Sequence, residues 1–323
     1  MGKHAYLIMA HNKFDQLAFL TSLLDHELND LFVYIDKSAT ITDEEIEAIN
    51  KSVSKSKVIF VPREIDVYWG DSSQIECEMY LYDFAYKYGD YSLFHLISGT
   101  DLPLVSQEKM HAFFDDEKRK DYNYITRFSK KEFDEKKFIR KIKFYHMTTK
   151  VSLASLSPLK RKLLLIYRRI EHETQKLLHI NRLKSIEKDG GTGVYYGCAN
   201  WKSITKEAIE AILRNREFIS KHFKHTFCAD ESYFPLIIEK ENLQDKIWRF
   251  EEIHDTPDEL QGNLRYINWW YSFYSPHPYV WTDSLEDQKA LDHAIELGHF
   301  FARKFDLDSY PGVKDYIISR VKK

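Results

Sequence analysis

The chain has 323 residues, of which 43% are apolar and 15% aromatic, so it can bury a large core as a globular protein. Its 47 Lys and Arg against 50 Asp and Glu leave a net charge of −3, which gives no reason to expect a nucleic-acid partner. The three cysteines form no CxxC pair and no metal-ligand spacing, which indicates free thiols in a reducing compartment.

Over the first 125 residues, short apolar runs alternate with segments of helical periodicity. The predicted strands cover residues 6–10, 31–35, 58–61 and 91–97. The predicted helices cover residues 14–28, a segment that begins at the Thr42-Asp43-Glu44-Glu45 start signal, and residues 74–88. This alternation is typical of an α/β fold with a central, mostly parallel sheet flanked by helices. The first apolar run is too short for a signal peptide or a membrane span, and no later one reaches spanning length, so we expect a cytoplasmic protein.

The middle of the chain is strongly charged. Residues 159–184 form a basic amphipathic stretch that has two interpretations. Either its Leu and Ile side chains pack on the core, or it meets anionic lipid or a lipid-phosphate acceptor as a peripheral helix at the inner face of a membrane. The glycines at 190–193 lack the P-loop lysine and the GxGxxG spacing, and therefore indicate only a turn.

The second half mixes strand and helix signals. Strand character returns at residues 194–201, and a capped helix follows from Ser203. Further helices are predicted over residues 230–238 and 284–303, with a short one after Pro311. Three Trp and four Tyr between residues 264 and 281 can pack in a core or stack on the apolar faces of sugars.

Two polar elements stand out as candidate site segments. The apolar run 94–104 is interrupted by Ser98-Gly99-Thr100-Asp101, at the carboxyl end of a predicted strand, where open α/β sheets bind ligands. Far along the chain, Asp230-Glu231 opens an apolar helix. The pair of elements predicts an enzyme whose site closes between them.

Eight segments carry a resemblance to a known family. In chain order they are YLIMAHN, FVYIDKS, VYWGDSS, HLISGTDLPL, YGCANWKSIT, CADESYFPLII, RYINWW and FARKFD. Together they resemble the core-2/I-branching β-1,6-N-acetylglucosaminyltransferases, glycosyltransferase family 14, here as a bacterial cytoplasmic member. The resemblance implies a single large α/β domain of GT-A type, a nucleotide-sugar donor, inversion at the anomeric carbon and no divalent metal. It makes residues 1–125 the nucleotide-sugar-binding half. Residues 126–323 become the acceptor-binding and catalytic half, with a helical insertion at about 130–188 and a C-terminal diphosphate-binding segment.

The resemblance assigns the chemical step to two residues. Glu231 matches the family's general base, which takes the proton of the acceptor hydroxyl. The alternative is that Asp230 and Glu231 only cap the following helix, with Asp230 the better cap. Lys304, with Arg303 beside it, matches the lysine that stabilises the leaving diphosphate in place of a metal. The alternative for that pair is compensation of a helix dipole.

The chain departs from the family's pattern at two places that concern binding of the donor's diphosphate. The chain's DxD, Asp306-Leu307-Asp308, lies far from the strand ends of the first half and is interpreted as a surface feature without function. Where the family usually supplies a second cation, the segment HPYVWTD has Tyr279, with His277 nearby and no Arg. Either another basic residue contributes or the donor is held differently.

The remaining site residues follow from the resemblance and the strand ends. The candidate donor-binding residues are His11, Asp36, Tyr68, Ser98, Gly99 and Asp101, besides Arg303 and Lys304. Asp36 and Tyr68 match nucleoside contacts, and Gly99 would let the backbone approach the donor sugar. Asp36 could instead cap a loop, and Asp101 could satisfy backbone amides. Trp269 and Tyr271 match acceptor contacts, with core packing as the alternative, and Gln74 stands where the family has an arginine.

The sequence therefore predicts an inverting, metal-independent transferase that moves a sugar from a UDP donor to a glycan or glycolipid hydroxyl. UDP-N-acetylglucosamine is the donor that the resemblance favours, and UDP-xylose and UDP-galactose stay open. Two rivals are a sugar-nucleotide hydrolase and a non-catalytic glycan-binding protein that uses the aromatic segment.

Overall fold

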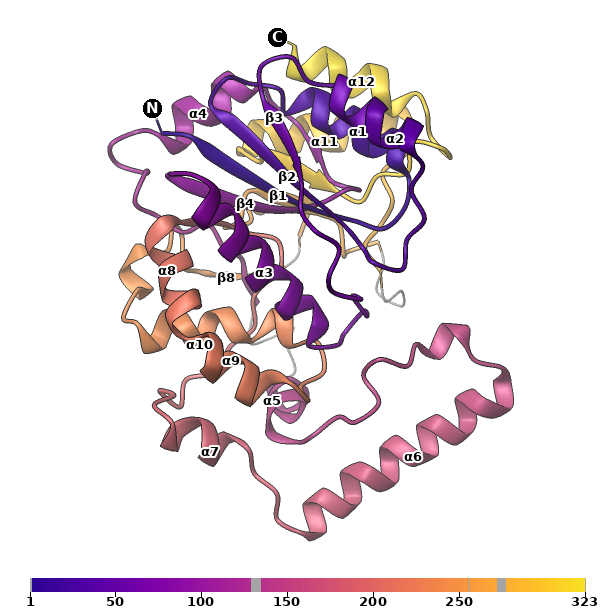
Figure 1. Ribbon diagram of the computed structural model, residues 1–323, viewed down its shortest axis with the longest axis vertical. Helices are drawn as coiled ribbons and strands as arrows, with labels where there is room; N and C mark the ends of the chain where they lie inside the picture. Colours follow the sequence, from indigo (N-terminus) through magenta and orange to yellow (C-terminus); the bar gives the residue numbers. More distant parts are fainter. Residues whose placement is uncertain (1, 129–134, 255, 272–276, 323) are drawn as a thin grey trace.

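A five-stranded sheet organises the protein, whose computed structural model describes residues 2–128, 135–254, 256–271 and 277–322. The strand order is β3-β2-β1-β4-β7 (Figure 1). Four of the strands are mutually parallel, and they are β1 (His4–Ala10), β2 (Asn29–Ile35), β3 (Lys57–Phe60) and β4 (Leu93–Ser98). At the edge, β7 (Ser203–Thr205) pairs antiparallel with β4. The expected α/β fold with a mostly parallel sheet is confirmed.

Alternate side chains of the strands build two cores on the two faces of this sheet. Along β1, Ala5 and Leu7 join one apolar cluster, whereas Tyr6 and Ile8 join the other, as the strand period of two requires. The first cluster is covered by α3 (Ser73–Tyr88), α8 (Lys206–Arg214) and α10 (Tyr233–Lys240). The second is covered by α1 (Phe14–Leu23), α4 (Gln107–Phe114), α11 (Leu285–Leu297) and α12 (Val313–Val321).

A smaller sheet brings the end of the chain to the end of β4. Its order is β5-β10-β9, from β5 (Leu102–Pro103), β10 (Phe301–Arg303) and β9 (Arg265–Ile267). A further pair joins β6 (Arg127–Phe128) to β8 (Glu252–Ile253). The other helices are α2 (Asp43–Lys51), α5 (Glu135–Lys143), α6 (Pro158–Leu177), α7 (Leu183–Lys188) and α9 (Arg216–Phe223). Short 3-10 turns cover Leu153–Ser155, Ala229–Glu231 and Gln244–Lys246.

Two expected elements differ from the structure. The helix predicted over residues 284–303 ends at Leu297, because Gly298 adopts a positive φ of 108° and the chain then enters β10. The strand predicted over residues 194–201 does not form. Cys198 contributes only an isolated bridge to Arg127, and the strand that joins the sheet lies later, at β7.

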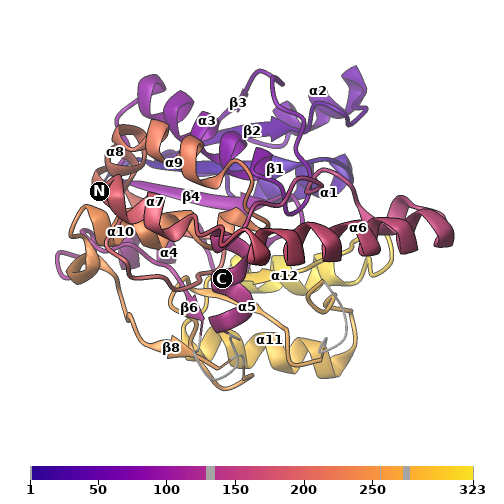
Figure 2. The ribbon, with the colours of Figure 1, turned by 90° about the horizontal axis from the view of Figure 1, so that it is seen from below.

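The basic stretch 159–184 divides into α6 and α7, and α6 does not pack its apolar side chains on the core. Leu159, Leu163 and Ile170 are 68%, 57% and 60% exposed. The polar side of α6 holds it to the protein instead, since Arg168 donates to the Thr148 carbonyl and Gln175 to the Tyr145 carbonyl, both at 2.9 Å. The core-packing interpretation is therefore wrong. In Figure 1, α6 runs along the outside of the molecule, away from the central sheet, and in the view of Figure 2 it crosses in front of the other elements.

Among the described helices, we find none with both the length and the apolar character that a membrane crossing needs.

Candidate active site

The carboxyl ends of the parallel strands and the end of β10 meet at one edge of the sheet. His11 follows β1, Asp36 follows β2, and Ser98 ends β4. The C-terminal segment is tied to this edge, because the Phe305 amide donates to the Thr100 carbonyl at 2.9 Å. The residues predicted to bind the donor therefore come together from segments almost 300 positions apart in sequence.

Asp36 holds the loop that contains Val67, Tyr68 and Gly70, which we call the donor-side loop. Its carboxylate accepts hydrogen bonds from the Ser38 and Val67 amides, each at 2.8 Å, and from the Ser38 hydroxyl. The residue after Val67 is Tyr68, whose ring is 41% exposed and faces the Lys150 ammonium at 5.5 Å. Asp36 thus acts as the loop cap that the sequence offered as an alternative, and in doing so it holds the backbone beside Tyr68.

The Ser98–Asp101 turn is shaped by internal contacts. Asp101 is 1% exposed, accepts from the Ser98 amide at 3.0 Å and pairs with Arg303 at 2.6 Å. At Gly99, a Cβ atom would lie 3.1 Å from the Ala10 side chain, so close packing against β1 explains the glycine. Asp101 therefore satisfies a backbone amide, as the alternative proposed, and also fixes the Arg303 guanidinium.

Arg303 and Lys304 differ in how far their charges are compensated. Arg303 lies between Asp101 and the Trp201 ring, 4.4 Å from the ring centroid. The Lys304 ammonium makes no hydrogen bond or ion pair with the part of the chain that the structure describes. Burial lowers the pKa of Lys304, and the charges of Arg303 and Lys13 lower it further. Because Arg303 belongs to a strand and not to a helix end, the helix-dipole interpretation of this pair is wrong.

Cations and carboxylates alternate around Lys304, where Asp101 pairs with Arg303 and both Asp306 and Asp308 pair with Lys13. Burial lowers the pKa of His11, and the nearby Lys304 and Arg303 lower it further although Asp36 opposes them. Lys13, which the sequence did not single out, is a third cation of this region. Of these three cations, Lys304 is the one whose charge no described carboxylate pairs with, which suits a contact to a bound diphosphate.

The DxD carboxylates have a structural partner. The Lys13 ammonium donates to Asp306 at 2.5 Å and to Asp308 at 2.7 Å, and these bonds raise the pKa of Lys13. These carboxylates therefore lie at the surface, as expected, where their pair with Lys13 ties the C-terminal segment to the start of α1. Tyr279 stands where the family usually has its second diphosphate-binding cation. Its hydroxyl donates a hydrogen bond to Asp287 at 3.1 Å, and its carbonyl accepts one from the Lys304 amide at 3.4 Å.

Glu231 lies in the 3-10 turn before α10, on the other flank of the same region. Its carboxylate accepts a hydrogen bond from the Lys141 ammonium at 2.9 Å, with side chains that are 30% and 27% exposed. Burial lowers the pKa of Lys141, but the charges of Glu231, Cys228 and Asp230 outweigh it, so the pKa is raised. Sequence reasoning missed Lys141, because the contact joins residues 90 positions apart within two charged segments.

Neither Asp230 nor Glu231 caps a helix, since the side chains at the start of the turn and of α10 make no capping hydrogen bond. The capping interpretation is therefore wrong. Asp230 is 7% exposed, and its Oδ1 has no hydrogen-bond partner among the described residues. Burial, with the charges of Glu231 and Glu78, raises the pKa of Asp230 to about 7. Below it, buried Glu78 pairs with Lys202 at 3.1 Å.

The turn that carries Glu231 is tied to both sides of the candidate site. The Cys228 amide donates to the Gly70 carbonyl at 2.9 Å, which joins the turn to the loop of Tyr68. Gly70 itself adopts a φ of 75°, and a Cβ atom there would lie 2.7 Å from the Phe227 ring. On the other side, the Cys198 amide donates to the Glu231 carbonyl at 2.9 Å, and the chain then runs to Trp201 beneath Arg303.

The aromatic segment separates into buried and open parts. Tyr266 and Trp281 are fully buried and stack at 5.3 Å, so core packing accounts for them. Trp269 is half-buried, and Tyr271 is 65% exposed beside it. Residues 272–276 lie outside the described residues. Tyr271 is thus the open aromatic side chain of the two that were predicted to contact the acceptor.

The sequence of this chain matches the model of a known protein family. The model of the core-2/I-branching enzymes matches residues 4–289. The chain belongs to the core-2/I-branching enzyme family. It is therefore a glycosyltransferase, and the resemblance carried by the eight sequence segments is confirmed over most of the chain. Family membership agrees with the expected GT-A type of fold, and it removes the non-catalytic glycan-binding protein from the rivals.

A solved structure shows a further similarity to this chain. The crystal structure of mouse xyloside xylosyltransferase 1 in its apo form is similar at 12% sequence identity and a TM-score of 0.36. The match covers 84% of this chain and 90% of the mouse chain. A search of curated proteins finds no match.

Proposed function

We propose that this glycosyltransferase moves a sugar from a UDP donor to a hydroxyl of a glycan or glycolipid, with inversion and without a divalent metal. The observation that carries the proposal is the position of Glu231. Its carboxylate caps no helix, and its turn is bonded both to the donor-side loop at Gly70 and to the segment that leads to Arg303. An inverting transfer needs a carboxylate beside the donor site that can take the proton of the acceptor hydroxyl.

In the proposed step, Glu231 takes the proton of the acceptor hydroxyl while the hydroxyl oxygen attacks the anomeric carbon. The bond from that carbon to the diphosphate oxygen breaks, and its electron pair leaves with UDP. Lys304, assisted by Arg303, stabilises the negative charge that accumulates on the diphosphate. Lys141 holds the Glu231 carboxylate by its hydrogen bond until the acceptor arrives.

The donor-binding roles divide into contact and positioning. We assign donor contact to His11, Tyr68, Ser98 and Gly99 at the carboxyl edge of the sheet. Two further residues, Asp36 and Asp101, act by positioning, since Asp36 holds the loop before Tyr68 and Asp101 holds Arg303. For the acceptor, we assign Trp269 and Tyr271, of which Tyr271 offers an exposed ring face.

The test measures UDP release from UDP-N-acetylglucosamine, UDP-xylose and UDP-galactose, with and without sugar acceptors. We expect one donor to give acceptor-dependent UDP release with a glycosylated product, UDP-N-acetylglucosamine being favoured by the family. Equal UDP release with and without acceptor would instead support the sugar-nucleotide hydrolase. No turnover with any donor and a broad acceptor panel would count against the proposed step.

We also propose that the outer face of α6 docks on an anionic membrane, where a lipid-linked acceptor would be presented. This face is defined by Leu159, Leu163, Ile166, Ile170 and Leu177, which share one side of the helix by their spacing. Each of these side chains is 46% to 79% exposed. Arg168, His172 and Gln175 lie on the opposite side, toward the protein.

Charge complementarity favours a lipid surface as the occupant of this face. The exposed basic residues that flank it are Lys160, Lys162, Arg169 and Lys176, of which Lys176 pairs with Glu173 at 3.0 Å. Basic flanks around an apolar stripe are the pattern of helices that lie in the interface of anionic bilayers. Between α6 and residues 140–149 lies a cavity of about 210 Å³ whose lining includes Arg140, Arg168 and Phe227. Phe227 directly precedes Cys228 in the Glu231 turn, so the membrane-facing helix and the candidate active site are close together.

Vesicle sedimentation tests this docking. We expect the protein to bind vesicles of phosphatidylglycerol and not vesicles of phosphatidylcholine, and to lose binding in Leu163→Glu/Ile170→Glu. Leu285→Glu, which changes an equally exposed leucine at the start of α11, is the matched control and should keep binding. Unchanged binding of the α6 variant would contradict the proposal. The proposal would also be contradicted if light scattering found dimers of the parent protein but monomers of the α6 variant. In that case a second copy of the chain would cover this face.

A further inference from the structure

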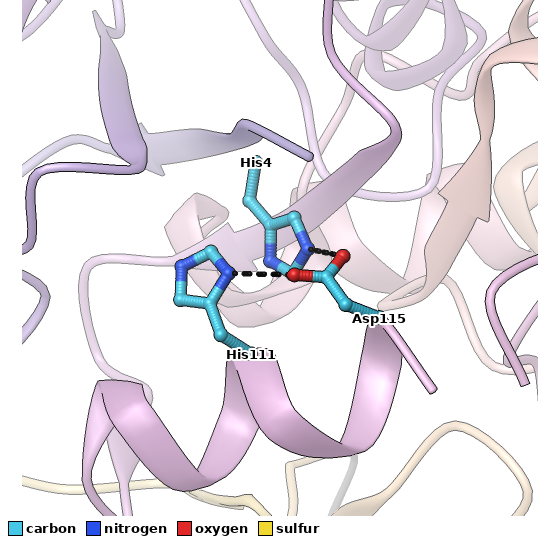
Figure 3. Close-up of side chains that lie close together, drawn as sticks. All are labelled: His4, His111 and Asp115. Carbon is cyan, nitrogen blue, oxygen red and sulfur yellow. Dashed lines mark ion pairs between the residues drawn. The ribbon is translucent and has the colours of Figure 1, made fainter. Parts of the chain in front are cut away.

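A cluster of two histidines and one aspartate lies at the opposite edge of the sheet from the candidate active site. His4 begins β1, while His111 on α4 and Asp115 at its C-terminal end are one helical turn apart. In Figure 3 the two rings and the carboxylate point toward one another. His4 Nε2 lies 3.5 Å from Asp115 Oδ1, and His111 Nδ1 lies 3.4 Å from Asp115 Oδ2.

The atoms that face one another in this cluster are buried and unsatisfied. His4 is 0% and His111 1% exposed. None of His4 Nε2, His111 Nδ1 and Asp115 Oδ2 has a hydrogen-bond partner in the described ranges. A buried polar atom without a partner costs about 1–3 kcal/mol, so three that converge on one point indicate a ligand between them.

The other nitrogen of each ring is already engaged. His111 Nε2 lies 2.9 Å from Asn29 Oδ1, and Asn29 Nδ2 donates to the Leu24 carbonyl, so Oδ1 is the acceptor. His111 therefore carries its proton on Nε2 and turns the lone pair of Nδ1 toward the cluster. His4 Nδ1 lies 3.1 Å from His95 Nε2.

The His95 contact continues into a chain of hydrogen bonds. His95 Nδ1 lies 2.7 Å from the Ser203 hydroxyl. His4 Nδ1 and His95 Nε2 share one proton, and in the tautomer that carries it on His4 Nδ1 the lone pair of His4 Nε2 faces the cluster. Rings whose far nitrogens are held by hydrogen bonds in this way are typical of histidines that bind a metal.

We infer that His4, His111 and Asp115 bind one divalent transition-metal ion, for which Zn²⁺ is the best match. Two imidazoles and one carboxylate are ligands that Zn²⁺ prefers. Bonds of about 2.0–2.1 Å in tetrahedral geometry put ligand atoms roughly 3.3 Å apart, and each histidine nitrogen already lies 3.4 or 3.5 Å from one of the two Asp115 oxygens. One ligand atom from each residue fits within 4.8 Å of the others. The Asp115 side chain is 12% exposed, so water can complete the coordination.

The role of this ion is structural. It fastens the first strand of the sheet to α4, at the amino ends of the parallel strands. Glu231 and Lys304 belong to the other edge, so the ion takes no part in the proposed transfer. A metal-independent reaction and a bound structural metal are therefore compatible, and each is tested separately.

The experiment uses the untagged full-length protein. After removal of metal with a chelator and dialysis, Zn²⁺ is added, and its content is measured by mass spectrometry together with the melting temperature. We expect about one Zn²⁺ per chain and a rise in melting temperature that Mg²⁺ does not produce. A chain that retains no Zn²⁺ and shows no shift with Zn²⁺ overturns the inference, whatever the variants do.

Variants locate the ion. Asp115→Asn should bind Zn²⁺ at least about tenfold more weakly, since even outer contacts of metal sites contribute that much. His293→Ala is the matched control, because His293 forms a surface pair with Asp258 at 2.9 Å outside the cluster, and this variant should bind as the parent does. Equal affinity of Asp115→Asn and the parent chain would refute the site.

Discussion

Asp230 makes the stability of this protein depend on pH, and one substitution can remove this contribution. The side chain is 7% exposed and lies near the charges of Glu231 and Glu78, which together with burial raise its pKa from 3.8 to about 7. Between roughly pH 4 and pH 7, the unfolded chain releases this proton while the folded protein keeps it. Stability is therefore lost as the pH rises through this window, and the loss is complete above it.

The magnitude follows from the shift. About three pKa units at about 1.4 kcal/mol each amount to roughly 4 kcal/mol above pH 7. In Asp230→Asn no proton is exchanged at this position, and the variant keeps the shape of the neutral acid. We expect it to be more stable than the parent by up to this amount at pH 8, and to differ little at pH 4.5.

Urea unfolding of both proteins at the two pH values measures the effect. Titrating groups that do not interact with Asp230 are common to both proteins, so their contribution cancels in the difference. Asp245→Asn, at an exposed position, controls for the loss of one negative charge. If the difference in unfolding free energy between Asp230→Asn and the parent is the same at pH 4.5 and pH 8, the reasoning about Asp230 is refuted.

Three further predictions concern the cations and the metal. Lys304→Ala should weaken UDP binding roughly tenfold and slow transfer, because its ammonium is the cation left without a partner in the described chain; calorimetry that finds unchanged UDP affinity would count against it. Lys202→Met should destabilise the protein by about 3–5 kcal/mol in chemical unfolding, since it leaves the fully buried Glu78 without its cation, and a change below about 1 kcal/mol would contradict this. Initial rates at 25 °C should survive EDTA, whereas the melting temperature should fall as the structural ion is removed; a strict Mn²⁺ requirement for turnover would contradict the proposed mechanism.

Local patterns were sufficient to predict most of the fold. The first four strands are apolar runs bounded by polar residues, and each structural strand overlaps its predicted range within three residues. The start of α2 was readable because Thr42 and Glu45 form a capping box. The helical periodicity of residues 284–303 predicted a helix that is too long. The helix ends at Gly298, and β10 forms because it pairs with β5 and β9.

The candidate site was only partly accessible from sequence. Glu231 and Lys304 could be found because their segments match the family in order. Lys141 and Lys13 could not, since their ion pairs join residues 90 and 293 positions apart. The apolar side of α6 also faces outward, which no periodicity can reveal, because the pattern is the same whether the stripe packs on a core or on another surface.

The measurement that tests the central claim most directly compares Glu231→Gln with the parent enzyme in UDP binding and in acceptor-dependent turnover. We expect UDP affinity within about twofold of the parent and a kcat lower by roughly 100-fold or more, as the loss of a general base requires. Asp230→Asn, which neutralises the adjacent carboxyl group, should keep turnover within about tenfold. A Glu231→Gln enzyme that transfers sugar at nearly the parent rate would contradict the assignment of Glu231 as the base.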